Sequence, residues 1–301
     1  MKKIAYLLAV LSLLVSSCSY GNYMLHFNGS QVDDRISSIV TIPASELPAI
    51  TAGSSYSFLI IADAHYGSSK TNRHTDRFIE KFTLALENAD ETKRPRFIIN
   101  LGDIMDDGLQ SEATDYLALE KKLKVIAKEK LGLSSPDDYK TFSIIGNHDL
   151  YDEDGWETWK KNFYPATKYR TSYFRFTLGS FSYYFLDTGN ATLGLTQLED
   201  LEKQLPSDPN PKIVFQHYPI VLDVSSFCLQ NTLERNRLMR DFARSNVCNI
   251  FTGHYHPGNS NDFGNFVEKT VKSFGYNDVA LLVTVDDAKK SVSYEEIKFS
   301  N

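Results

Sequence analysis

Five short apolar runs, each followed by polar residues of metal-ligand type, constrain the fold of this chain most strongly. They are Phe58–Ala62, Phe97–Leu101, Phe142–Ile145, Lys212–Phe215 and Val247–Phe251. Continuous runs of this length are typical of strands that are buried on both faces of a sheet. Between the first three runs, apolar residues recur at helical spacing over about 78–89 and 116–131. This alternation of strand and helix predicts a parallel sheet covered by helices.

The polar residues after these runs are the candidate functional residues. In open sheets with parallel strands, ligands bind beyond the carboxyl ends of the strands. Five of the seven histidines stand at these ends. The two exceptions, His26 and His74, are interpreted as ordinary surface or core histidines. The candidate metal ligands are Asp63, His65, Asp103, Asn147, His217, His254 and His256, and His148 and Asp149 stand beside them.

The number and chemistry of these candidates indicate a site for two metal ions. One ion uses three or four protein ligands, so seven candidates are too many for one ion and suitable for two. Imidazole combined with carboxylate and amide oxygen favours Mn, Fe, Co or Zn over Ca or Mg. Two ions roughly 3.5–4 Å apart can clamp the attacking and leaving oxygens of an in-line displacement at phosphorus. A ligand shared by both ions must be a carboxylate, and Asp103 is the natural candidate.

These residues resemble, in chain order, the five motifs of the calcineurin-like metallophosphoesterases. The motifs are Asp63-Ala64-His65, Gly102-Asp103, Gly146-Asn147-His148-Asp149, His217 and Gly253-His254-Tyr255-His256. Each motif alone is weak, whereas five in order after apolar runs are specific. The resemblance covers about Tyr56 to His256 and implies a four-layer α/β/β/α fold. In that fold, two mixed sheets pack face to face with helices on the outside.

The resemblance also implies roles for the individual residues. It assigns Asp63, His65 and His256 to one metal, Asn147, His217 and His254 to the other, and Asp103 to both. His148 would contact the scissile phosphate and protonate the leaving group, and Asp149 would orient His148. The nucleophile would be a hydroxide held between two divalent ions of Mn, Fe, Zn or Co.

One departure from the family pattern bears on the substrate. The purple acid phosphatase branch has glycine in the first motif and a tyrosine ligand three residues after the second-motif aspartate. Here those positions are His65 and Asp106. The combination looks more like the branch of cyclic-nucleotide and glycerophosphodiester phosphodiesterases, which also contains phosphatases. We therefore expect a small phosphate ester, either a monoester or a diester, as the substrate.

Two other functions remain as alternatives. A binding protein on the same scaffold that has lost catalysis is one, although such relatives usually lack some of the ligands present here. A nuclease is the other. The formal net charge of -6 and the lack of a lysine- and arginine-rich block after residue 3 argue against a nucleic-acid partner.

The first eighteen residues predict export. Lys2 and Lys3 precede an apolar stretch over 4–15, which is too short to span a bilayer comfortably. Val15-Ser16-Ser17-Cys18 resembles the lipobox of bacterial lipoproteins, so Cys18 is the predicted lipidation site and membrane anchor in the cell envelope. An ordinary cleaved signal and an uncleaved anchor are the alternatives. The predicted divisions are a signal over 1–18, a tether or irregular segment over 19–54, and the metallophosphoesterase domain over 55–301.

Local signals complete the prediction for the second half of the chain. Two antiparallel strands over 172–178 and 181–186 are joined at Gly179-Ser180. Thr196 with Glu199 predicts a capping box for a helix, and residues 278–298 predict a closing hairpin.

Two features of the sequence leave their interpretation open. The aromatic residues of 150–170 are either a substrate wall or part of the core. Cys228 and Cys248 do not make a disulfide framework, and the sequence leaves open whether they pair.

Overall fold

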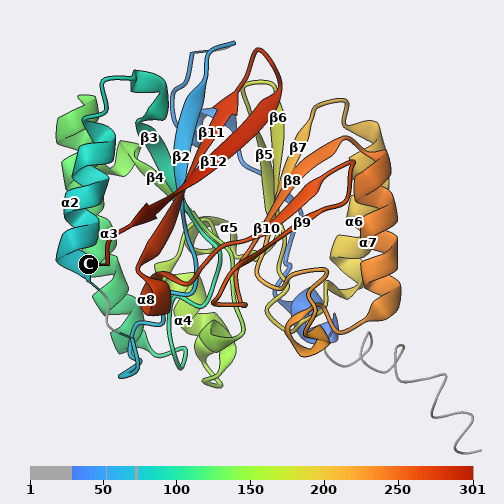
Figure 1. The fold of residues 1–301 in the computed structure, drawn as a ribbon. Coiled ribbons are helices and arrows are strands. Elements are labelled where there is room, and N and C mark those ends of the chain that lie inside the picture. Colours follow the sequence, from blue (N-terminus) through green and yellow to red (C-terminus); the bar gives the residue numbers. More distant parts are fainter. Residues whose placement is uncertain (1–28, 52, 72–73, 301) are drawn as a thin grey trace, which may run out of the picture.

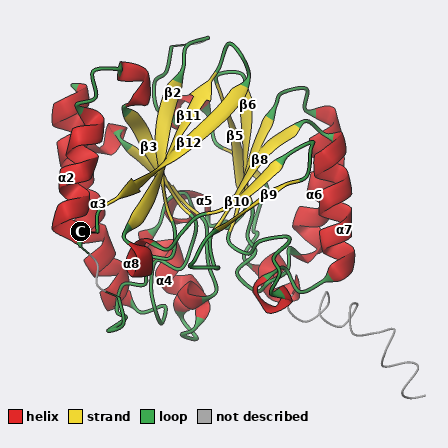
Figure 2. Ribbon diagram, in the orientation of Figure 1, coloured by secondary structure: helices red, strands yellow, loops and turns green. Residues whose placement is uncertain are grey.

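A computed structural model describes residues 29–51, 53–71 and 74–300, and it shows two sheets packed face to face between outer helices (Figures 1 and 2). The order in one sheet is β12-β11-β2-β3-β4, and in the other it is β1-β5-β6-β7-β8-β10-β9. Both sheets mix parallel and antiparallel neighbours. The predicted four-layer α/β/β/α class is confirmed.

The five-stranded sheet contains the first three predicted runs and the closing hairpin. Its strands are β2 (Tyr56–Ile61), β3 (Pro95–Asn100), β4 (Lys140–Ser143), β11 (Val279–Asp286) and β12 (Ser291–Lys298). β2, β3 and β4 are parallel, as predicted. β11 joins antiparallel to β2, and β12 pairs antiparallel with β11. The outer face is covered by α2 (Thr75–Leu86) and α3 (Gln110–Leu131).

The seven-stranded sheet contains two strands that the sequence did not predict. Its strands are β1 (Val40–Thr41), β5 (Phe174–Leu178), β6 (Phe181–Phe185), β7 (Lys212–Gln216), β8 (Val247–Thr252), β9 (Asn259–Asp262) and β10 (Val267–Thr270). β5 and β6 form the predicted hairpin, with Gly179 at φ 60° in the turn. β9 and β10 are too polar to show an apolar run. The helices α6 (Gly194–Ser207) and α7 (Thr232–Arg244) cover this sheet.

Alternation along β2 explains why its sequence is apolar from Phe58 to Ile61. Phe58 and Ile60 point into the core between the two sheets, whereas Leu59 and Ile61 point into the core beneath the outer helices. The core between the sheets is rich in aromatic rings, such as the stacked pair Phe58 and Phe97 with centroids 4.9 Å apart. The two sheets are thus held together by apolar packing, which fixes the relative positions of their strand ends.

The described part of the segment predicted as a tether or irregular segment packs against the seven-stranded sheet. Residues 29–34 are helical, β1 pairs with β5, and Val32 is buried. Arg35 donates from Nε and Nη2 to the buried carboxylate of Asp187, over 2.7 and 2.9 Å. Burial of apolar and paired side chains therefore draws this stretch into the fold, while residues 1–28, with the predicted signal and Cys18, lie outside the described residues.

The same segment corrects the predicted start of α6. The carboxylate of Asp33 accepts hydrogen bonds from the backbone N–H groups of Leu195 and Thr196, over 3.2 and 2.9 Å. These are first-turn donors that have no partner within the helix. The helix begins at Gly194, so Thr196 stands inside the first turn and cannot form the predicted capping box with Glu199.

Shorter helical elements lie in the connections. They are α4 (Gly155–Asn162), α5 (Ala166–Tyr169), α8 (Phe274–Asn277), and the 3-10 turns η1 (Ala44–Glu46), η2 (Glu91–Lys93), η3 (Pro136–Asp138), η4 (His148–Leu150) and η5 (Ser225–Phe227). Trp159 and Phe163 are buried in the core beneath α3. Core packing is therefore the role of these two aromatic side chains.

Two further observations concern the cysteines and the membrane. Cys228 is buried and Cys248 is half-buried, and both are free thiols. Among the described residues, no helix combines the length and the apolar character needed to cross a bilayer.

Candidate metal centre

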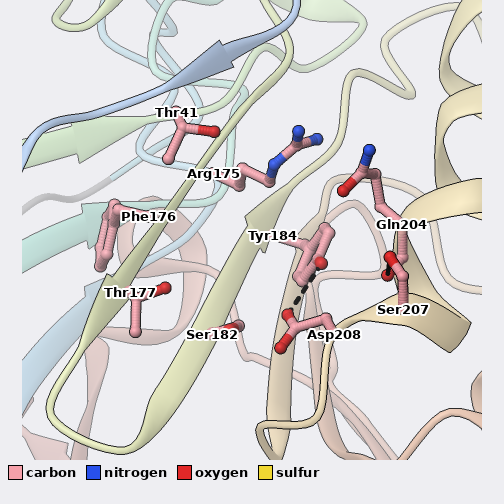
Figure 3. Close-up of a pocket in the computed structure, with 9 residues that line it drawn as sticks. All are labelled: Thr41, Arg175, Phe176, Thr177, Ser182, Tyr184, Gln204, Ser207 and Asp208. Atoms are coloured by element: carbon pink, nitrogen blue, oxygen red, sulfur yellow. Dashed lines mark hydrogen bonds between the residues drawn. The ribbon is translucent and has the colours of Figure 1, made fainter.

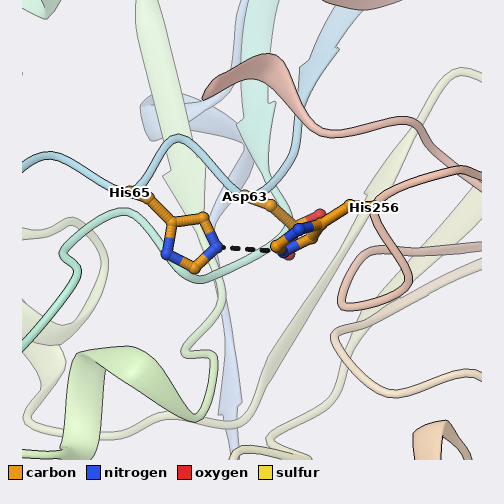
Figure 4. A group of neighbouring side chains, drawn as sticks. All are labelled: Asp63, His65 and His256. Carbon is orange, nitrogen blue, oxygen red and sulfur yellow. Dashed lines mark hydrogen bonds between the residues drawn. The ribbon is translucent and has the colours of Figure 1, made fainter. Parts of the chain in front are cut away.

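The seven predicted ligands come together where the strands β2, β3, β4, β7 and β8 end. Two of the three groups whose ligand atoms lie within 4.8 Å of one another among the described residues consist of predicted ligands: Asp63, His65 and His256 (Figure 4), and Asp103, His217 and His254. The remaining group is His65, Asp106 and His148. Asn147 joins the second group, with its Oδ1 3.1 Å from His217 Nε2.

The first group offers donor atoms that other partners leave available. Asp63 Oδ1 accepts the backbone N–H of His254 over 2.8 Å, whereas the buried Oδ2 has no hydrogen-bond partner. His65 Nε2 and His256 Nε2 face each other at 3.1 Å (Figure 4). His65 Nδ1 lies 2.9 Å from Asp106 Oδ1, so a proton on Nδ1 leaves Nε2 as the ligand atom. An unpartnered buried carboxylate oxygen beside two imidazole nitrogens fits a cation.

Asp103, a member of the second group, also lies near the first group. Asp103 Oδ2 lies 3.3 Å from His217 Nε2 and 3.8 Å from His65 Nε2, so this oxygen stands between the two groups. His217 Nδ1 donates to the carbonyl of Leu101 over 2.7 Å, which leaves Nε2 free to bind. Asn147 Nδ2 donates to the hydroxyl of Tyr151 over 3.2 Å, so its Oδ1 faces the centre.

Burial favours neutral imidazoles in this centre. It lowers the pKa of His254 to about 3 and that of His256 to about 4, and it also lowers the pKa of His65. Burial raises the pKa of the Asp63 carboxyl to about 8. Neutral imidazole is the form that binds metals. Buried carboxylates pressed together are stabilised by a cation.

His217 and Asp103 are the exception, because they attract each other strongly. Burial alone would lower the pKa of His217, but the Asp103 carboxylate raises it to about 9. Burial alone would raise the pKa of Asp103, yet the charge of His217 holds it well below its usual range. A positive charge at this point is therefore favoured by the site itself, in agreement with the donor set.

The backbone is strained at four of the predicted ligands. Four of the nine non-glycine residues with positive φ among the described residues are predicted ligands, namely Asp63, His65, Asp103 and His254, with φ of 51°, 45°, 50° and 66°. The left-handed region is unfavourable for such residues and concentrates at functional sites. The strain aims several ligands from short loops toward one point.

Gly146 allows two of these loops to touch. A methyl group there would lie 2.2 Å from Asp103 Oδ1 and 2.3 Å from the Asp103 backbone nitrogen. Gly102 has φ 88°, and a methyl group there would lie 2.6 Å from the nitrogen of Gly146. The glycines of the second and third motifs therefore permit the close approach of the β3 and β4 loops.

The carboxylate of Asp149 contacts the backbone of these loops and not the side chain of His148. Its buried carboxylate accepts the backbone N–H groups of Asp103, Met105 and Gly146 over 2.9, 2.9 and 2.8 Å. His148 Nδ1 lies 2.6 Å from the carbonyl oxygen of Asp106. Asp106 thus contacts both His148 and His65, whereas the carboxylate of Asp149 is directed to the backbone of the loops, and the orienting role of Asp149 stays a prediction. Asp106 was noted in the sequence only as a departure from a tyrosine ligand.

A separate crevice of about 180 Å³ lies beside β1, β5, β6 and the end of α6 (Figure 3). Its cation and its tyrosine hydroxyl already have partners. Arg175 pairs with Asp200 over 2.6 Å, and the Tyr184 hydroxyl donates to Asp208 over 2.9 Å. Since its cation is neutralised, this crevice is a poor phosphate site compared with the metal centre.

Comparison with solved structures supports the fold. A dimetal phosphatase from Danio rerio has a TM-score of 0.53 and 13% identity, covering 81% of this chain and 99% of that one. GAP50, described as the anchor in the inner membrane complex of Plasmodium, has a TM-score of 0.53 and 15% identity, covering 82% and 90%. At these identities, the likeness shows the shared fold alone.

Comparison of sequences defines the family. A protein of Fibrobacter succinogenes named as a probable cyclic nucleotide phosphodiesterase is 25% identical over 206 residues, which cover 65% of this chain and 71% of that protein. The family described as calcineurin-like phosphoesterase matches residues 56–258, a range that includes all five motifs. With this match over most of its length, the chain belongs to the calcineurin-like phosphoesterase family and is a metal-dependent phosphoesterase.

Proposed function

We propose that this protein hydrolyses phosphodiesters at a centre of two divalent transition-metal ions, with cyclic nucleotides as the first substrates to test. The observation that carries the proposal is the position of Asp103 Oδ2 between two ligand groups, 3.3 Å from His217 and 3.8 Å from His65. One carboxylate oxygen placed in this way suits a pair of ions acting together on one phosphate. Mn, Fe, Zn and Co match the donor set.

The chain's own residues divide the remaining work. Bound ions supply a Lewis acid for the phosphate oxygens and activate water. Asp103 also holds the loop that carries Asn147 and His148, because its Oδ1 accepts the backbone N–H of His148 over 2.8 Å. The Nδ1 atom of His148 is engaged with the Asp106 carbonyl, so Nε2 is the atom that passes a proton to the leaving oxygen.

The acid role of His148 has a specific test. His148→Asn should retain metal and lose most activity on diesters with poor leaving groups, while losing much less on aryl esters that need no protonation. The dependence of kcat/KM on the leaving-group pKa measures this. Equal losses on good and poor leaving groups would contradict the role.

The shared ligand has its own test. Asp103→Asn should lower the occupancy of both metals, which elemental analysis of the purified protein measures. Unchanged metal content would refute sharing. A parent protein that binds no transition metal and hydrolyses no ester would overturn the proposed function itself.

The preference for diesters rests on two observations. His65 and Asp106 stand where the purple acid phosphatase pattern has glycine and tyrosine, and the Fibrobacter relative carries a phosphodiesterase name. A panel of cyclic nucleotides, nucleotides, glycerophosphodiesters and phospholipid headgroups, each with Mn, Fe and Zn, decides the preference. Faster hydrolysis of monoesters than of every diester would contradict it.

We also propose that the protein is exported and anchored in the cell envelope through a lipid on Cys18. The proposal is supported by Lys2, Lys3, the apolar stretch over 4–15 and the small residues before Cys18. Cys18→Ser should release the protein from the membrane fraction, whereas Cys248→Ser should leave it there. Mass spectrometry of the mature amino terminus checks the lipid, and an unmodified Cys18 would refute the anchor.

A further inference from the structure

Exposed aromatic rings gather at the metal centre. Three aromatic side chains are exposed among the described residues: Tyr151 at 58%, Phe227 at 39% and Tyr276 at 40%. The other large exposed hydrophobic residues of the described chain are all aliphatic. All three rings contact histidines of the candidate centre, so their exposure coincides with the site.

Each ring lies against a different histidine. The Tyr151 ring is 4.2 Å from that of His148, and the Phe227 ring is 5.6 Å from that of His254, both between centroids. The Tyr276 ring stacks on His256 at 4.6 Å with an interplanar angle of 18°. Phe227 belongs to η5, after β7, and Tyr276 belongs to α8, before β11. The rings therefore reach the site from separate loops.

The position of Tyr276 is fixed by the ligand Asp63. The hydroxyl of Ser273 donates to the backbone carbonyl of Asp63 over 2.8 Å and accepts the backbone N–H of Tyr276 over 3.1 Å. One side chain thus connects the start of α8 to the first metal group. A ring held in this way can meet a substrate without being ordered on binding, which lowers the entropic cost.

Support of the histidines does not explain the exposed rings. Tyr218, which is partly buried, already packs on His254 with centroids 3.9 Å apart, so Phe227, which is 39% exposed, adds a second ring. Tyr151 has an additional task, because its hydroxyl accepts from Asn147. Support of His254 therefore does not account for Phe227, and Tyr276 keeps 40% of its surface exposed while it stacks on His256.

We infer that Phe227 and Tyr276 bind a planar ring of the substrate, so that the centre prefers phosphodiesters that carry an aromatic group. The inference rests on the proposed phosphodiesterase function and adds a substrate class to it. A nucleobase and an aryl group share the required chemistry, which is a flat apolar face for stacking. Stacking on protein aromatic rings is tolerant of base identity, so the surface selects flat groups over alkyl groups.

Two diesters with the same leaving group test the inference, because the bond that breaks is the same in both. Phenyl para-nitrophenyl phosphate and methyl para-nitrophenyl phosphate differ only in the group that stays on phosphorus. The ratio of their kcat/KM values should fall about fivefold or more in Phe227→Leu and in Tyr276→Leu. Phe227→Tyr and Tyr276→Phe keep the rings and should keep the ratio. Val224→Ala, in the same loop as Phe227 and 45% exposed, is the matched control.

A binding measurement keeps the inference independent of turnover. Calorimetry on the Mn-loaded protein should show tighter binding of phenylphosphonate than of methylphosphonate, and both leucine variants should reduce the difference. Unchanged ratios in both variants, in hydrolysis and in binding, would overturn the inference. If the unsubstituted protein hydrolyses no diester, the proposed function is contradicted. The comparison of phenylphosphonate with methylphosphonate binding then still tests whether Phe227 and Tyr276 bind a planar ring. Comparing thymidine with phenyl as the retained group distinguishes a nucleobase from an aryl source.

Discussion

The strand ends of the two sheets hold their predicted metal ligands in different ways. In the five-stranded sheet, residues of the motifs support one another, since Asp149 accepts the N–H groups of Asp103 and Gly146. In the seven-stranded sheet, the loop after His217 is held from elsewhere. The buried Glu268 of β10 accepts the N–H groups of Ile220 and Val221 over 2.6 and 3.2 Å.

Because of this difference, substitutions of supporting residues should act differently in the two halves. In the five-stranded half, a single change acts directly on a ligand, because support and ligand belong to the same tight loops. In the seven-stranded half, the supports belong to remote elements. Thr188, for example, accepts the backbone N–H of His217 over 3.0 Å. We therefore expect changes of supporting residues in the first half to affect metal binding and catalysis, and changes of supporting residues in the second half to affect stability first.

Gly146→Ala should have the largest effect. The added methyl group would lie 2.2 Å from Asp103 Oδ1, so the shared ligand must move, and a small displacement in an active site costs about a hundredfold in rate. Metal content and kcat/KM measure the loss. Gly132→Ala is the control, because its φ of 66° brings strain but no atom lies within 4 Å. Equal activity in the two variants would show that the close approach of Gly146 to Asp103 is not needed for activity.

Asp149→Asn should come next. The amide cannot accept all three backbone N–H groups, so the β3 and β4 loops loosen and metal affinity falls about 10- to 100-fold. Because Asp149 supports loops rather than His148, activity should fall to the same degree on good and poor leaving groups. A loss confined to poor leaving groups would support the orienting role predicted from the sequence.

Glu268→Gln tests the support in the seven-stranded half through the pH dependence of the free energy of unfolding. Burial raises the pKa of Glu268 to about 7, above its ordinary 4.5. Between these values the unfolded chain loses its proton first, so the free energy of unfolding falls as pH rises and is lowest above pH 7. The variant should reduce this fall by on the order of 1–3 kcal/mol. Urea denaturation at pH 4.5 and 8 measures it, and identical pH dependence in both proteins would contradict the shift.

Asp33→Ala should have the smallest effect. It removes the acceptor for two first-turn N–H groups of α6, which costs about 1 kcal/mol of stability. Metal content and kcat should stay at the parent values, since α6 carries none of the predicted ligands. Asp33→Asn keeps one acceptor oxygen, so its free energy of unfolding should lie between those of the parent and of Asp33→Ala. A loss of metal in Asp33→Ala would break the separation between the two halves.

The strands that carry the motifs were predictable from sequence, because burial on both faces imposes continuous apolar runs. The opposite holds for β9 and β10, whose residues Asn259–Asp262 and Val267–Thr270 are mostly polar. Their pairing depends on β8, which offers an open edge, and on Glu268, which faces a loop some fifty residues earlier in the chain. Such partners are set by the fold and leave no local pattern.

In the candidate site, too, some residues could be predicted from the sequence and others could not. The ligand residues follow from the resemblance and converge in the structure, whereas their supports do not follow from it. Asp149 stands next to His148 in sequence, yet the 3-10 turn at His148–Leu150 directs its carboxylate to other loops. Likewise, Asp33 caps a helix that begins at Gly194, far along the chain. Adjacency in sequence was misleading in the first case and uninformative in the second.

The left-handed backbone at Asp63, His65, Asp103 and His254 limits how far this protein can be improved by selection for thermal stability. Each position costs about 1 kcal/mol or more, which a glycine would recover. Each such glycine would also delete a predicted ligand. A thermal screen run without an assay of hydrolysis would therefore enrich well-folded, inactive molecules, and laboratory evolution of this scaffold must select for both properties at once.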